Sequence, residues 1–259
     1  MDQIAVLGYT KVYGDFTAVH DLSFSVAAGE ILGLCGPNGA GKTTTLRALA
    51  GILQPTRGIV RVAGHDLAID PIPAKRALAF VPDEPALFEH LTVSEHLELI
   101  ARLYGVPDYL PRAQAILSEV ELTEKKDDLP QALSRGMKQK LSLACALLHA
   151  PRAIILDEPL TGLDPVGIRR MKDTIMRCAR EGAAVVLSSH LLSLVEEMCQ
   201  RVLIIKRGQR VFLGSKAEIV ESYPGLSLEE VFLKLTQDGQ PPASLPPTPA
   251  LPPQAGGGS

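Results

Sequence analysis

The sequence predicts an α/β fold built around a partly parallel β-sheet. Short runs rich in Val, Ile and Leu alternate along the chain with segments that have the spacing of amphipathic helices, and this pattern is typical of strand–helix–strand units. A glycine-rich turn at 36–43 separates one apolar run from one helix. A helical stretch at about 84–150 interrupts the strand pattern. With 259 residues, 46% of them hydrophobic, the chain can bury the core of one large domain or two small ones.

Strands dominate the first part of the predicted fold, where aliphatic residues cluster between turn residues. The expected strands cover 4–9, 22–26, 30–35, 58–62 and 77–81. A helix is expected from Lys42 to about Ala50, and Gly51 stands where a helix would end. The glycine-rich turn therefore joins the end of a strand to the start of a helix.

The middle of the chain, at about 84–150, is predicted to be an all-helical insert between strands of one α/β core. Apolar residues recur there at helical spacing and give three segments one packing face each. The predicted faces are Leu97, Ile100, Ala101 and Tyr104; then Leu110, Ala113, Leu117 and Val120; and then Met137, Leu141, Ala144 and Leu148. We interpret the last stripe as core packing on a helix at 134–149.

The strand pattern returns after the insert and ends in a hairpin at Gly208. Strands are expected at 153–156, 183–187, 201–205 and 210–213, followed by a short helix at 226–235. From Gly239 onward, 21 residues contain seven prolines and no charge, a composition that cannot bury a core. We therefore expect one domain at 1–236 and a disordered Pro/Gly-rich tail at 237–259.

Composition excludes several classes of function. The formal net charge is -3, from 26 basic and 29 acidic residues, which argues against nucleic-acid binding through bulk charge. Aromatic residues make up 4% of the chain and Trp is absent, so a surface of many stacking platforms is not expected. No run approaches the roughly 20 apolar residues of a membrane-spanning helix, and the start of the chain lacks the pattern of a secretory signal. Four widely spaced cysteines indicate a reduced, cytoplasmic protein with buried thiols.

The glycine-rich turn has the residue types that a phosphate-binding loop needs. Its sequence, Gly36-Pro37-Asn38-Gly39-Ala40-Gly41-Lys42-Thr43, fits GxxxxGK[ST] and is followed by Thr44. Glycines let successive backbone N–H groups wrap round phosphate oxygens, and the following helix adds the partial positive charge of its N-terminus. We expect Lys42 to reach the β- and γ-phosphates and the Thr43 hydroxyl to ligate Mg²⁺.

A pair of carboxylates follows the apolar run at 153–156. A buried strand would deliver Asp157 to the carboxyl edge of the sheet, where ligands collect in folds of this class. Nucleotide chemistry needs one carboxylate on Mg²⁺, directly or through water, and a second group that activates water. Asp157 suits the first task and Glu158 the second, although an apolar run that ends in acids also describes an ordinary solvated strand end.

Together these motifs resemble those of the ATP-binding subunit of ABC transporters, and the resemblance covers about 1–236. The motifs stand in the family order: a Walker A loop at 36–43, a signature similar to LSGGQ at 133–137 (LSRGM), a Walker B run at 153–158, a D-loop at 160–164 (LTGLD), and a switch histidine at His190. The resemblance implies a P-loop NTPase core with a mixed sheet, an N-terminal antiparallel β part and a helical insert.

The family resemblance assigns roles to further residues. Ser134 and Gly136, at a helix N-terminus, would hold the γ-phosphate of ATP bound by a second ATPase subunit, so that two copies enclose two ATP molecules head to tail. His190 would donate a hydrogen bond to the γ-phosphate, and Tyr13 would stack on adenine. Two simpler interpretations stay open: Tyr13 as a half-buried strand residue and His190 as a helix cap.

Two departures from the family pattern stand out. Asp83 follows the strand at 77–81 where the family has a Gln that contacts Mg²⁺ and the attacking water. Asp83 could still bind Mg²⁺, with an added negative charge, or Glu84 could fill the position after a local shift. The other departure is Arg135-Gly136-Met137 in place of Gly-Gly-Gln. Arg135 could add attraction to phosphate or be a solvated side chain.

The sequence therefore predicts an ATPase that hydrolyses ATP with Mg²⁺ and drives a separate integral membrane permease from the cytoplasmic face of the membrane. We expect a homodimer, a permease contact at 83–104, no nucleic-acid partner, and export in preference to import because 227–232 (SLEEVF) resembles exporter-type subunits. Two rival predictions are an ABC ATPase that acts outside transport and a regulatory nucleotide binder. The transported substrate is not predicted, since the permease selects it.

Overall fold

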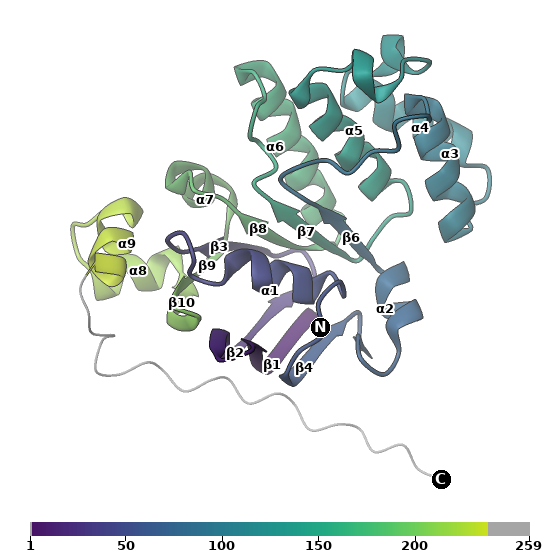
Figure 1. The fold of residues 1–259 in the computed structure, drawn as a ribbon. Coiled ribbons are helices and arrows are strands. Elements are labelled where there is room, and N and C mark those ends of the chain that lie inside the picture. The colour runs from purple at the N-terminus through teal and green to yellow at the C-terminus, as the bar shows by residue number, and fades with distance from the viewer. Residues whose placement is uncertain (1, 238–259) are drawn as a thin grey trace.

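The computed structural model describes residues 2–237, which form two β-sheets packed with helices (Figure 1). The smaller sheet is antiparallel and has the strand order β2-β1-β4-β5. Its strands are β1 (Asp2–Tyr13), β2 (Phe16–Ala27), β4 (Arg57–Val62) and β5 (His65–Asp66). The antiparallel N-terminal part that the family resemblance implies is confirmed.

The larger sheet has six strands in the order β10-β9-β3-β8-β7-β6. Its strands are β3 (Ile31–Cys35), β6 (Leu78–Val81), β7 (Ala153–Asp157), β8 (Ala184–Ser188), β9 (Arg201–Lys206) and β10 (Gln209–Ser215). All neighbours pair in parallel except β9 and β10, which form the predicted hairpin round Gly208. This places the carboxyl ends of β3, β6 and β7 at one edge of the sheet.

Nine helices are assigned within residues 2–237. They are α1 (Lys42–Leu49), α2 (Pro71–Arg76), α3 (Val93–Tyr104), α4 (Tyr109–Glu119), α5 (Arg135–Leu147), α6 (Pro165–Arg180), α7 (Leu192–Met198), α8 (Lys216–Ser222) and α9 (Leu228–Gln237). Two short 3₁₀ turns, Thr123–Lys125 and Pro130–Ala132, lie between α4 and α5. No helix in this part of the chain is long and apolar enough to cross a membrane.

The period-two alternation of the central strands gives each face of the larger sheet its own apolar core. One face presents Ile31, Ile154, Leu156, Val185 and Leu187, which pack against apolar side chains of α3 to α7 and α9. The other presents Leu32, Leu34, Ile155, Val186 and Leu203, which pack against α1 and the antiparallel sheet. Figure 1 shows α1 between the two sheets. The glycine-rich turn is thus fixed by packing on both sides of α1.

Helices α3, α4 and α5 follow β6 and precede β7, where the helical insert was expected. Their buried side chains agree with most of the predicted faces, including Leu97, Leu117 and Leu141. Leu110 is wrongly predicted: it is 59% exposed, although Ala113, Leu117 and Val120 of the same predicted face are buried, because it lies in the first turn of α4, where Tyr109 packs against the core instead. The predicted tail at 237–259 lies outside the described residues, apart from Gln237 at the end of α9.

The helix α6 has no counterpart among the predicted elements. It begins at Asp164, whose side chain accepts a hydrogen bond from the Gly167 backbone N–H, with Pro165 in the first turn. Its buried face includes Met171 and Ile175. Asp164 followed by Pro165 is a helix-start signal in the sequence, so this helix was open to prediction.

Three of the four cysteines should react with thiol reagents only when the protein unfolds. Cys35, Cys178 and Cys199 are buried, and burial raises the pKa of Cys35 to about 12 and that of Cys178 to about 11, so little thiolate forms near neutral pH. We expect slow labelling of these thiols with an aromatic disulfide reagent at pH 8, and rapid labelling in denaturant. Ser118→Cys, on the exposed side of α4, should label at once; equally fast labelling of the native cysteines would contradict their burial.

Candidate active site

The glycine-rich turn leaves β3 at Cys35 and enters α1 at Lys42. Gly39 and Gly41 have φ values of +77° and +102°, a conformation that favours glycine. A Cβ on Gly41 would lie 2.8 Å from the carbonyl oxygen of Ala18, so the backbone also needs glycine for space. Gly41 is the N-cap of α1 and supplies no side-chain acceptor for the first N–H groups of the helix, which suits binding of an external anion.

The Lys42 ammonium folds back over the glycine-rich turn. It donates to the carbonyl oxygens of Gly36 at 2.7 Å and Pro37 at 3.2 Å. Among the neighbouring residues, Pro37, Asn38 and Thr43 are at least partly exposed, whereas the Ala40 side chain is buried. The turn therefore offers an accessible backbone and one positive charge to a phosphate.

The two carboxylates of the Walker B run have different environments. Asp157 ends β7 and is only 8% exposed; burial raises its pKa, and the charge of Asp83 raises it further. Glu158 adopts a left-handed φ of +49°, which turns its side chain out of the strand. Burial likewise raises the pKa of Glu158, while His190 lowers it. A glutamate with a raised pKa is a stronger base than a free one.

His190 contacts Glu158 directly. The imidazole Nδ1 lies 2.8 Å from Glu158 Oε2, at the end of a loop that connects β8 to α7. The residue before the first turn of α7 is Leu191, not His190, so the interpretation of His190 as a helix cap is wrong. Because an ionised carboxylate only accepts hydrogen bonds, Nδ1 carries the proton in this contact. The structure thus joins the predicted base to the predicted switch residue.

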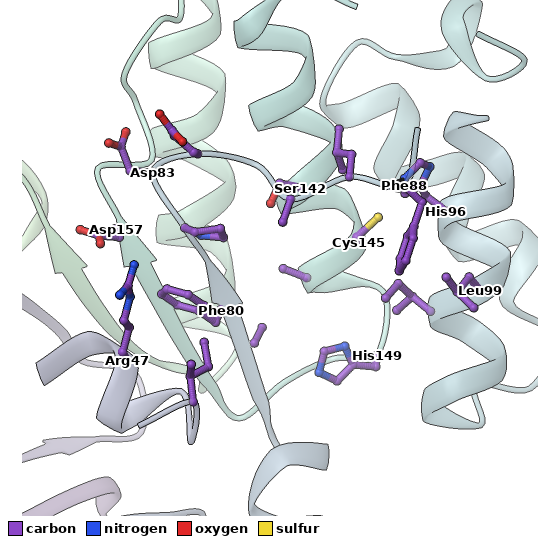
Figure 2. A pocket seen from close by; sticks show the side chains of 18 of the residues that line it. Arg47, Phe80, Asp83, Phe88, His96, Leu99, Ser142, Cys145, His149 and Asp157 are labelled. Carbon is purple, nitrogen blue, oxygen red and sulfur yellow. Dashed lines mark hydrogen bonds between the residues drawn. The ribbon is translucent and has the colours of Figure 1, made fainter. Parts of the chain in front are cut away.

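A cavity of about 820 Å³ opens beside this edge of the sheet, and Asp83, Asp157 and Thr43 line it. Figure 2 shows the Asp83 and Asp157 carboxylates at the same side of the cavity, with the Arg47 guanidinium reaching towards Asp157. Glu84 also lines the cavity, so the alternative in which Glu84 takes the place of the family Gln stays open. The far side is mainly apolar, with Phe88, Leu99, Ile100 and Tyr104 among its lining residues.

The donor set fits Mg²⁺ bound together with a phosphate. Within residues 2–237, no group of three or more His, Cys, Asp and Glu side chains is arranged to hold a metal ion. Mg²⁺ bound through one or two carboxylates, a hydroxyl and phosphate oxygens does not need such a group. Asp83 Oδ1 is buried without a hydrogen-bond partner among the described residues, so this carboxylate can still accept a ligand. Thr43, Asp157 and Asp83 are thus the side chains that would hold the ion.

Other predicted site residues lie elsewhere. Ser134 and Gly136 do not line the cavity; Ser134 is the N-cap of α5 and accepts a hydrogen bond from the Met137 N–H. Tyr13 ends β1 and is 48% exposed, with the Lys11 ammonium 5.1 Å from its ring centroid. Thr44, the residue after the Walker A loop, is half-buried in the first turn of α1. Ser134 and Gly136 therefore lie at the start of α5 and Tyr13 at the end of β1, and neither these residues nor Thr44 line the cavity.

Two residues of the site were absent from the prediction. Arg47 lines the cavity and lowers the pKa of Asp157; its spacing of four residues from Thr43 puts both on one face of α1, a signal that the sequence contains. Gln139 is 1% exposed and donates to the Pro82 carbonyl oxygen at 3.3 Å. No local pattern marks Gln139, because its partner lies in a distant segment.

Comparisons with known proteins agree on one family. A family model described as ABC transporter matches residues 19–161. The chain is similar to the ABC-type transporter ATP-binding protein EcsA of Bacillus subtilis, with 33% identity over 92% of this chain and 98% of that protein. It is also similar to the Nod factor export ATP-binding protein I of Ralstonia nicotianae, with 34% identity over 88% of this chain and 72% of that protein.

A solved structure gives the same result for the fold. The structure of an ATP-binding subunit of an ABC transporter superposes with a TM-score of 0.87 at 34% identity, covering 90% of this chain and 99% of that one. The similarity thus extends over nearly all of the described residues.

Proposed function

The chain belongs to the ABC transporter family and has the fold of its ATP-binding subunits, and on this premise we propose that it hydrolyses ATP as a dimer and energises export through a separate membrane permease. The observation that carries the proposal is the arrangement at one sheet edge: Thr43, Asp83 and Asp157 line one cavity, and Glu158 contacts His190 beside them.

The side chains suit phosphoryl transfer to water. Lys42 exchanges its bonds to the loop carbonyls for bonds to the β- and γ-phosphates, which neutralises charge there. Thr43, Asp157 and Asp83 would hold a Mg²⁺ ion, which would neutralise further charge on the phosphate oxygens. Glu158, with its raised pKa, accepts a proton from the attacking water. To donate a hydrogen bond to the γ-phosphate, His190 must either break its contact with Glu158 or carry protons on both ring nitrogens.

Dimerisation would complete each site. Ser134 is exposed at the N-cap of α5, which supports a role for this helix start on the nucleotide of a second copy. Tyr13, at the exposed end of β1, would stack on adenine. Closure of the dimer would then depend on ATP, and hydrolysis would reopen it.

The apolar side of the cavity supports a permease contact within 83–104. Phe88 is 60% exposed, and its backbone N–H donates to His96 Nε2 at 3.0 Å, which holds the loop before α3 in place. Exposed apolar residues at the rim of a cavity mark protein–protein contacts. The names of relatives, a Nod factor export protein among them, favour export over import.

Phosphate release and co-purification test the proposal and its rivals. The purified chain should release phosphate from MgATP at steady state, and a polytopic membrane protein should co-purify with it from ATP-free detergent extract. Phosphate release without such a partner would favour an ABC ATPase outside transport. MgATP binding with no phosphate release, even with the permease present, would favour a regulatory nucleotide binder.

A further inference from the structure

The two departures from the family pattern, Asp83 and Arg135, contact each other. The Arg135 guanidinium lies 3.5 Å from Asp83 Oδ1, and the two side chains are 57% and 46% exposed. This distance is that of an ion pair and is longer than an ordinary N–H···O hydrogen bond. Arg135 is thus paired with Asp83. It is not an isolated solvated side chain, and its charge does not act only on an external phosphate.

Packing on Gly162 sets the direction of the Arg135 side chain. Gly162 has a φ of +81°, and a Cβ on it would lie 3.1 Å from Arg135 Cδ and 3.3 Å from Cγ. The aliphatic part of Arg135 therefore covers bare backbone at the turn after β7. A Cβ on Gly136 would come within 2.8 Å of the Gly162 carbonyl oxygen, so the start of α5 also lies against this turn.

The position of Asp83 is likewise linked to α5. Gln139, buried in α5, donates to the carbonyl oxygen of Pro82, the residue before Asp83. Asp83 Oδ1 is itself buried and has no hydrogen-bond partner. A buried carboxylate oxygen without a hydrogen bond is costly unless a positive charge stands near it, and the Arg135 guanidinium provides that charge.

The negative charge of Asp83 adds to other negative charges at the same wall of the cavity. Asp157 lines this wall too, Glu158 follows it in the chain, and a triphosphate would add several negative charges. An uncharged side chain at this position would not oppose the triphosphate. Mg²⁺ held jointly by Thr43, Asp157 and Asp83 would offset the charge of Asp83 only in part, so a second nearby cation favours triphosphate binding.

We propose that Arg135 is a positioning residue that neutralises Asp83 within the same chain, so that an aspartate can stand beside the bound triphosphate. This inference rests on the proposed function, since only a phosphate-bearing ligand makes the charge of Asp83 unfavourable. Asp83 and Arg135 then form one functional unit, and replacement of either residue has an effect that depends on the other.

A double-mutant cycle in the full chain tests the pair. Arg135→Met keeps the aliphatic part that covers Gly162 and removes the charge, and Asp83→Asn removes the opposing charge at constant size. The dissociation constant of a non-hydrolysable MgATP analogue is measured by titration for the parent, both single variants and the double variant. We expect Arg135→Met to weaken binding about three- to fivefold with Asp83 present, the upper range for a half-exposed pair, and less than about twofold in the Asp83→Asn background.

Two further measurements distinguish this ion pair from other roles of Arg135. Arg135→Lys should restore most of the affinity, and the coupling should shrink at high salt because both side chains are half exposed. Equal weakening by Arg135→Met in both backgrounds would show that Arg135 attracts phosphate independently of Asp83 and would overturn the inference, as would no weakening in either. A parent chain that binds no MgATP analogue would overturn the proposed function itself.

Discussion

ATP hydrolysis by Glu158→Gln should fall by about 100-fold or more, while MgATP binding is retained. General-base catalysis contributes about 10²- to 10⁴-fold, and glutamine has the size of glutamate without its basicity. Glu158 is positioned for this role by its left-handed backbone and its contact with His190. Steady-state phosphate release measures the rate, and light scattering with and without MgATP measures the dimer, which should accumulate because hydrolysis no longer reopens it.

The matched control for this variant is Glu229→Gln. Glu229 is exposed in the first turn of α9, an element outside the cavity that Asp157 lines, and its replacement should leave turnover within about twofold, as for most surface substitutions. Phosphate release by Glu158→Gln at the parent rate would remove Glu158 from the role of general base.

Lys42→Ala should lose about 10- to 100-fold in affinity for MgATP. Hydrogen bonds to charged groups contribute about 1.5–3 kcal/mol each, and about 1.4 kcal/mol corresponds to tenfold in affinity. In the structure the Lys42 ammonium already reaches the turn through Gly36 and Pro37, so it needs only to exchange carbonyl oxygens for phosphate oxygens. Titration with a fluorescent ATP analogue gives the dissociation constant.

Lys126→Ala provides the control, because Lys126 is exposed in the segment between α4 and α5. Lys126→Ala changes the net charge of the chain by the same amount as Lys42→Ala. A loss of affinity seen only in Lys42→Ala therefore reports on the glycine-rich turn and not on net charge. The fold should survive Lys42→Ala, since α1 is held by buried Leu46 and Leu49. Unchanged MgATP affinity in Lys42→Ala would contradict the assignment of the glycine-rich turn to phosphate.

The residues at the carboxyl edge of the larger sheet could be predicted from short stretches of sequence. The order of strand, glycine-rich turn and helix at 30–50 needs glycine at positive φ between an apolar strand and a helix, and the glycines and the apolar run are visible in the sequence. The same holds for Asp157 at the end of β7 and for the hairpin at Gly208. By contrast, Leu110 was wrongly predicted to be buried because helical spacing gives the direction of a side chain but not how far the core extends past the first turn of a helix.

The family, the α/β fold, the glycine-rich turn and the carboxylate pair could be predicted from the sequence alone, because these depend on contiguous residues with fixed spacing. The three-dimensional fold was needed to show which distant residues meet: His190 with Glu158, Gln139 with Pro82, and Arg135 with Asp83. Such contacts depend on how strands far apart in the chain are ordered in the sheet and how α5 packs on them, and no local spacing records either.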